Sequence, residues 1–323
     1  MKRFTLIFCC FAVVCVFGLS GATAQAGSYP DRNISLVIPG TPGSIIDITG
    51  RIMAEELTKI LGVKLVPMNK PGASFTLGTD FVVRSKPDGY TISYTNSGGI
   101  LSARVAKPEV VPYEIDDLVP LGLHLFFPMG IAVQANSPYK TFKDLVDHAK
   151  KNPGAVTMST SGKFSSAFYV MKMIEQAAGI KLTQVPYKGG KAVIAAILGG
   201  HVEACCDAGL KFTPHVKAGK LRILLASKRM KEFPDVPIPQ ELGYDVDIFS
   251  PWFAFYVPKG TPEDVKKVLI PAIKKAISEP VSKAKIEKMG FMVSYGTPEE
   301  LQKMVPKQYK ELKAIMDAVR AKK

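Results

Sequence analysis

The sequence predicts an α/β protein with mainly parallel sheets, large enough to form two domains. Short segments rich in Val and Ile alternate with longer segments whose apolar residues recur at helical spacing. This alternation is typical of parallel strands that are joined by helices. The chain has 323 residues, and the 297 that follow its first 26 are more typical of two domains than of one.

The first 26 residues have the pattern of a secretory signal peptide. Lys2 and Arg3 precede an apolar stretch that runs from Phe4 to about Leu19, and small residues follow in "ATAQA" (22–26). A retained membrane anchor is the alternative, but no second apolar stretch approaches the roughly 20 residues that a spanning helix needs. We therefore expect residues 1–26 to be removed and the mature chain to be exported.

The first half of the mature chain begins with the expected strand "ISLVI" (34–38). Apolar residues from Ile45 to Ile60 then recur at helical spacing until Gly62, which predicts a helix. Strands are expected at 64–69, at 88–96 after the turn pair Asp88-Gly89, and at 129–135, with a glycine-bearing turn at 69–78. A helix is expected at 141–151, with Thr141 as its N-cap.

The second half repeats the alternation. Strands are expected at 155–161, 181–187, 202–208, 221–227 and 250–260, and helices at about 165–178 and 192–200. Two late helices have clear start signals, because Thr261 and Thr297 are each followed by Pro and then by an acidic residue, Asp264 or Glu300, at the position of a capping box.

Composition argues against several classes of function. The net charge is +14, or +12 after the leader, but the lysines are scattered and no nucleic-acid-binding signature accompanies them, so we expect no nucleic-acid partner. Only Cys205 and Cys206 remain after leader removal; as sequence neighbours they are expected to be buried apolar residues without a disulfide. The four histidines have no metal-ligand spacing, so neither a metal nor a cofactor is expected.

The turn "PGTPGSIID" (39–47) lies between the first strand and the first helix. Ser44 and Asp47 have capping-box spacing, which explains the turn without any ligand. The alternative is a cradle for an anion, because the free N–H groups at a helix start attract negative charge. The two readings have about equal weight from this turn alone.

Similar turns follow other expected strands. They are "NKPGASFT" (69–76), "TNSGG" (95–99), the serine-rich loop in "MSTSGKFSSAFYV" (158–170) and "PYKGGKAV" (186–193). The last is no phosphate loop, since Val185 and Ala192 replace the required Gly and Ser/Thr. No G-x-S-x-G elbow supports a serine hydrolase. Each turn is weak evidence alone, but all fall at the carboxyl ends of strands, where ligands bind in open α/β sheets.

These segments, in this order, resemble the receptor proteins of the tripartite tricarboxylate transporter system, the Bug family of periplasmic solute-binding proteins. The resemblance is carried by "YPDRNISLVIPGTPGSIID", "NKPGASFTLGTDFV", "STSGKFSS", "VPYKGGKAVIAAILGGHVEACCD", "HVKAGKLRILLAS" and "FPDVPIPQELGY", and extends from about residue 29 to 302. It implies a type II periplasmic binding protein fold, in which two α/β lobes close on a ligand like a Venus flytrap. The implied lobes are 27–127 plus 250–323, and 128–249, with hinges near "HLFFPMG" and "DIFSPWF".

The resemblance also implies that the chain is no enzyme. It would bind a small carboxylate in the periplasm and deliver it to a membrane permease with a large and a small subunit, as a monomer without metal or cofactor. The ligand-binding residues it implies, together with two extra cations and the aromatic residues near them, are Gly40, Thr41, Pro42, Gly43, Ser44, Asp47, Ser74, Phe75, Thr76, Asn96, Ser97, Ser161, Gly162, Lys163, Phe164, Ser165, Ser166, Tyr187, Lys188, Gly189, Gly190, Asp207 and Lys211.

The chain departs from the family pattern at two turns. Gly43-Ser44 and Ile46 stand where the family has two glycines and Ser/Thr, and Ser74-Phe75-Thr76 replaces a Gly-Gly-Asn-like run. With Lys163 and Lys211 as extra cations, a dicarboxylate, a tricarboxylate or an aromatic carboxylate all remain candidate ligands. A receptor that serves a sensor kinase and an exported hydrolase are the alternative functions.

Overall fold

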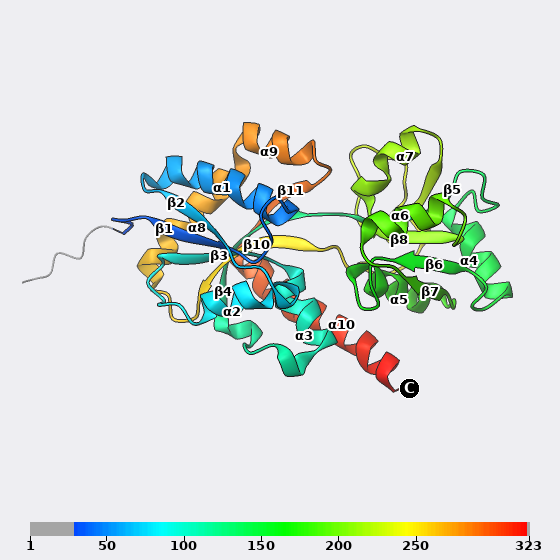
Figure 1. The fold of residues 1–323 in the computed structure, drawn as a ribbon, viewed down its shortest axis with the longest axis horizontal. Coiled ribbons are helices and arrows are strands. Elements are labelled where there is room, and N and C mark those ends of the chain that lie inside the picture. Colours follow the sequence, from blue (N-terminus) through cyan, green and yellow to red (C-terminus); the bar gives the residue numbers. More distant parts are fainter. Residues whose placement is uncertain (1–28, 322–323) are drawn as a thin grey trace, which may run out of the picture.

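The computed structural model describes residues 29–321, so the expected signal peptide at 1–26 lies outside the described residues. Figure 1 shows two α/β lobes side by side. The first contains a six-stranded sheet of order β11-β4-β10-β3-β1-β2, and the second a five-stranded sheet of order β7-β6-β8-β5-β9. The strands are β1 Ile34–Ile38, β2 Leu65–Asn69, β3 Thr91–Asn96, β4 Leu118–Phe126, β5 Met129–Gln134, β6 Thr157–Thr160, β7 Thr183–Pro186, β8 Ala204–Ala208, β9 Leu221–Ala226, β10 Trp252–Pro258 and β11 Met292–Gly296.

Helices cover both faces of each sheet. In the first lobe α1, α8 and α9 pack together on one side, and α2, α3 and α10 lie on the other (Figure 1). The helices are α1 Ile45–Leu61, α2 Thr76–Val83, α3 Ala103–Ala106, α4 Phe142–Lys151, α5 Ser166–Ala178, α6 Gly190–Leu198, α7 Thr213–Lys217, α8 Glu263–Ser278, α9 Pro280–Glu287 and α10 Pro298–Arg320. None of these helices is both long and apolar enough to cross a membrane.

The type II fold predicted from the resemblance is confirmed, but the expectation of mainly parallel sheets is wrong. β1, β2 and β3 run parallel, as do β6, β7 and β8, whereas β10 is antiparallel to β3 and β4, and β5 is antiparallel to β8 and β9. The reason is the double crossing between lobes. β4 leads out of the first lobe and β10 leads back into it, so these neighbours run in opposite directions.

The two crossing segments lie next to each other. The Phe127 amide donates to the Pro251 carbonyl at 3.0 Å, and the Ser227 and Ser250 hydroxyls are 2.7 Å apart. Because both segments leave the same ends of the two sheets, the lobes are joined at one place. The residues at which each lobe ends stay a prediction.

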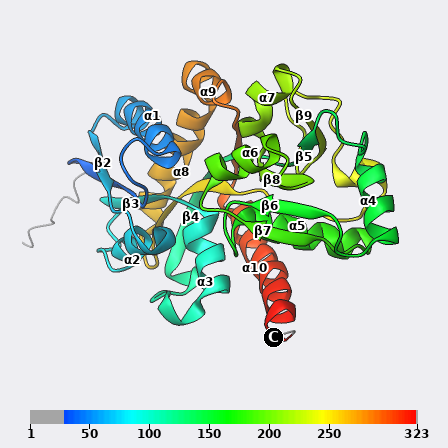
Figure 2. The ribbon, with the colours of Figure 1, turned by 45° about the vertical axis from the view of Figure 1, so that its right-hand side comes forward.

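Helix α10 contacts both lobes. Figure 2 shows it running down between them, and it packs against β4 and α3 of the first lobe and α5 of the second. Gln308 of α10 accepts a hydrogen bond from the indole Nε1 of the buried Trp252 at 2.9 Å. The C-terminal helix therefore supports the strand that returns across the hinge.

Some of the predicted helix starts are confirmed and others are wrong. The capping boxes of Thr141 with Asp144 and of Thr297 with Glu300 are present, so both predicted N-caps are confirmed. The Thr261 cap is wrong: α8 begins at Glu263, and the Thr261 hydroxyl donates to the Pro258 carbonyl instead. The reciprocal Ser44–Asp47 box is also absent, although Ser44 does occupy the N-cap position.

Some elements were not anticipated from the sequence. β4 and β11 were not predicted as strands, and the turn after β2 leads at once into α2. The lysine-rich stretch after residue 263 forms two helices, because α8 ends at Ser278 and Pro280 starts α9, where its missing N–H costs nothing. Cys205 and Cys206 are free and fully buried, as predicted, and burial raises the pKa of both thiols.

Candidate functional site at the facing ends of the two sheets

The polar turns of the first lobe all lie at the edge of the sheet that faces the second lobe. β3 and β4 are both antiparallel to β10, so they end on the same side, and Asn96, the last residue of β3, pairs with Phe253 just inside β10. β1 and β2 are parallel to β3 and end there too. Since β4 continues into the second lobe from this end, the turns after β1, β2 and β3 face that lobe.

In the second lobe, the carboxyl ends of the parallel strands likewise lie on the edge that faces the other lobe. Met129, the first residue of β5, pairs with Ala208, the last residue of the antiparallel β8. β6 is parallel to β8, and β7 is parallel to β6, so all three end next to the crossing segment. The serine loop, the "PYKG" turn and the turn after Asp207 therefore face the first lobe. Six turns from two lobes meet at one junction.

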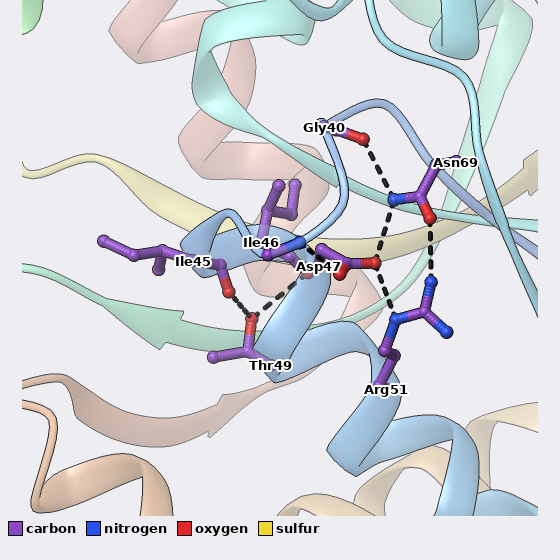
Figure 3. A network of polar contacts seen from close by, with 8 residues as sticks. Gly40, Ile45, Ile46, Asp47, Thr49, Arg51 and Asn69 are labelled. Atoms are coloured by element: carbon purple, nitrogen blue, oxygen red, sulfur yellow. Dashed lines mark hydrogen bonds and ion pairs between the residues drawn. The ribbon is translucent and has the colours of Figure 1, made fainter.

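A buried carboxylate braces the first turn (Figure 3). Asp47 is 3% exposed and accepts hydrogen bonds from the Gly43 amide at 2.8 Å, the Arg51 Nε at 2.9 Å and the Asn69 amide nitrogen at 2.8 Å. Asn69 also donates to the Gly40 carbonyl at 3.0 Å and accepts from Arg51 at 2.8 Å. The network ties the ends of β1 and β2 to the start of α1.

These contacts set the charge state of Asp47. Burial alone would raise its pKa, but the hydrogen bonds from Arg51, Asn69 and Gly43 outweigh burial, and the pKa is lowered. Both carboxylate oxygens are engaged within the lobe, so Asp47 shapes the turn. Sequence reasoning missed Arg51 and Asn69; the i,i+4 spacing of Asp47 and Arg51 was the available signal.

The turn after β2 has an unusual backbone. Ala73, Ser74 and Phe75 have φ values of 43°, 56° and 76°, a left-handed run that non-glycine residues rarely adopt. Phe75 lies against the next turn, since a Cβ placed on Gly98 would be 3.0 Å from its ring. The Thr76 hydroxyl donates to the Ala73 carbonyl at 2.8 Å. This turn is therefore held against the one that follows β3.

The side chains after β3 are used inside the lobe. The Asn96 side-chain oxygen accepts the Gly99 amide at 3.0 Å, and the Ser97 hydroxyl accepts the Trp252 amide at 3.4 Å. Both residues are buried. Their contacts connect this turn to the first residue of β10, and so to the hinge.

The serine loop is closed on itself. The hydroxyls of Thr160 and Ser165 both donate to the Gly162 carbonyl at 3.1 Å, and the Gln184 amide nitrogen donates to Thr160 Oγ1 at 2.8 Å. Ser161 and Ser166 are half-buried. Gln184, on neighbouring β7, was missed by sequence reasoning because no motif marks it.

The "PYKG" turn leads into α6 beside an ion pair. Lys211 donates to Asp207 at 2.7 Å, and Asp207 is 4% exposed. Both groups lie against the first turn of α6, because a Cβ on Gly190 would be 2.2 Å from Lys211 Nζ and 2.5 Å from Asp207 Oδ2. Only a glycine fits here without moving the pair. Tyr187 is half-buried, and Lys188 and Gly189 are exposed.

The electrostatics of the junction favour an anion. The N-termini of α1, α5 and α6, where N–H groups lack helical partners, lie on the two facing edges. Lys163 and Lys188 are exposed and make no ion pair with any residue from 29 to 321. Asp207 is the one acidic side chain in the three turns of the second lobe, and Lys211 neutralises it.

Comparison with known proteins finds relatives that match most of this chain. Residues 49–320 match the model of the tripartite tricarboxylate transporter family receptor, TctC. A protein encoded in the gbd 5′ region of Cupriavidus necator is 33% identical over 95% of this chain and 94% of its own length. The protein BugT of Bordetella pertussis is 31% identical over 88% of this chain and 89% of its own.

Solved structures share the fold. A ligand-free TctC solute-binding protein from Polaromonas superposes with a TM-score of 0.83 at 26% identity, over 90% of this chain and 99% of its own. MatC from Rhodopseudomonas palustris, solved with malate, gives a TM-score of 0.68 at 22% identity over 89% and 100% of the two chains. A second R. palustris protein, solved with adipate, gives 0.71 at 23% over 90% and 97%.

Proposed function

This chain belongs to the tripartite tricarboxylate transporter receptor (TctC, or Bug) family, whose members are solute-binding receptors and not enzymes. We propose that it captures a small carboxylate between its two lobes. The bound protein then delivers the ligand to a membrane permease with a large and a small subunit. The leader pattern at residues 1–26 supports export to the periplasm, the compartment of the family.

One observation carries this proposal. The turns after β1, β2 and β3 in one lobe, and after β6, β7 and β8 in the other, lie on edges that face each other across the hinge. Each edge holds helix N-termini, and the second also holds Lys163 and Lys188. The two R. palustris relatives were solved with malate and with adipate, which are both small carboxylates.

Closure supplies the mechanism. Each lobe alone offers part of a donor set, so an anion is fully coordinated only when both edges reach it, and binding shifts the protein toward the closed form. The two adjacent crossing segments at Phe127 and Pro251 provide the axis. The permease then recognises the surface of the closed form.

A ligand screen tests the proposal. Dicarboxylates, tricarboxylates, monocarboxylates and amino acids are added to the mature chain, and the melting temperature is measured, with the matching alcohols as uncharged controls. At least one carboxylate is expected to raise the melting temperature, because it binds the native state only. If every carboxylate leaves it unchanged at millimolar concentration, the proposed function is wrong.

A further inference from the structure

The two facing edges differ in charge. On the second lobe Lys163 and Lys188 are exposed and without an ion-pair partner in the described part of the chain. On the first lobe Arg51 is paired with Asp47. Lys70 has no ion-pair partner among the described residues, but it is half-buried, lies 4.0 Å from the Phe81 ring centroid and lines a separate surface hollow. The exposed, unpaired lysines of these turns are therefore on the second lobe.

The first lobe instead presents apolar side chains at this edge. Ile45, the first residue of α1, is 43% exposed, and Ile48, one turn further, is 40% exposed. In Figure 3 the side chain of Ile45 points away from the Asp47 carboxylate. Phe75, half-buried, adds an aromatic ring from the neighbouring turn. Apolar groups exposed beside a ligand edge lose their contact with water when a ligand covers them.

From this asymmetry we infer that the ligand is an amphipathic monocarboxylate. Its one carboxylate is held by the lysines of the second lobe and by the helix N-termini of both edges, and its apolar body lies against Ile45, Ile48 and Phe75. The inference rests on the proposed function and narrows its substrate class. A second carboxylate at the far end of the ligand would meet the two isoleucines, and burying a charge there without a partner is costly.

Matched pairs of ligands test the inference on the mature chain. Hexanoate is compared with adipate, and benzoate with terephthalate, by isothermal titration. Each monoacid is expected to bind at least about tenfold more tightly than its diacid, because the second carboxylate must be desolvated against Ile45. Diacids that bind as tightly as the monoacids, or more tightly, overturn the inference but leave the proposed function standing. No binding by any of the four overturns the inference, and the wider screen then decides the proposed function.

A variant identifies the apolar side. Ile45→Asn is expected to weaken hexanoate about fivefold or more while changing acetate less than twofold, because acetate has too short a body to reach the side chain. Val281→Asn, at an apolar residue 76% exposed on α9, is the matched control and should change neither. Equal loss for hexanoate and acetate in Ile45→Asn, or no loss for hexanoate, contradicts the proposed orientation.

Discussion

Replacing Asp47 with Ala is expected to destabilise the first lobe strongly, although the residue lies on a surface helix. The carboxylate is 3% exposed and accepts hydrogen bonds from Gly43, Arg51 and Asn69 at 2.8 to 2.9 Å. Its loss would leave the Gly43 amide unpaired and would release Asn69, which holds the Gly40 carbonyl. The ends of β1 and β2 would no longer be tied together.

The magnitude follows from the burial of each partner. The Arg51 side chain is 47% exposed, so water can replace most of its interaction with Asp47, and this ion pair contributes little to the free energy of unfolding. The hydrogen bonds from Gly43 and Asn69 to a charged acceptor contribute roughly 1.5 kcal/mol each. We therefore expect Asp47→Ala to lower the free energy of unfolding by about 3 kcal/mol.

Denaturant unfolding, followed by the fluorescence of Trp252 in the first lobe, measures this loss. Asp80→Ala is the matched control, because Asp80 and Arg84 form the same i,i+4 pair on α2 with Arg84 65% exposed, and it should cost less than about 1 kcal/mol. The folded-state pKa of Asp47 is lowered, so its stabilisation is present above the unfolded pKa of ~3.9 and is lost as the pH falls through the folded pKa. Equal costs for the two variants, or a difference that stays constant down to pH 3, would refute the reasoning.

Three further predictions concern the turns and the hinge. Because φ of Ser74 is 56°, Ser74→Gly should leave the free energy of unfolding unchanged or raise it by up to about 1 kcal/mol, whereas Ser74→Val should lower it by about 2 kcal/mol. Thermal melts of both variants would show whether the left-handed backbone is strained. Gly190→Ala should lower stability by about 1 to 3 kcal/mol, because the added Cβ would displace Lys211 and Asp207; no loss would argue against the close packing. Gln308→Leu should cost about 1 to 2 kcal/mol and shift the emission of Trp252, whose indole loses its acceptor; an unchanged spectrum would contradict that contact.

The fold class was readable because local signals agreed with it. The strand at 34–38 is apolar except for Ser35, the strand at 204–208 is apolar except for Asp207, and Thr297 caps α10 through a capping box as its spacing indicates. The antiparallel strands β5, β9 and β10 were predicted as strands but not in their direction, and β4 and β11 were missed. In β4 apolar residues alternate with Pro120, Gly122 and His124, and proline and glycine are unfavourable inside a strand, so the segment carried no clear strand signal although it is buried on both faces.

The candidate site was predictable as a set of turns, but not in its internal contacts. Position at the ends of parallel strands identified the turns. The bracing residues Arg51, Asn69 and Gln184 carry no motif, and their roles depend on which strand ends become neighbours. For the same reason Asp47, which has the spacing of a cap, serves instead as the acceptor that joins three segments.

Small-angle X-ray scattering of the mature chain, with and without the carboxylate that raises the melting temperature most, tests the central claim of closure. The radius of gyration is predicted to decrease when that carboxylate is added, and to stay unchanged with the matching alcohol, because only the anion coordinates both edges. A radius of gyration that is the same with saturating carboxylate would contradict closure around a ligand held between the lobes.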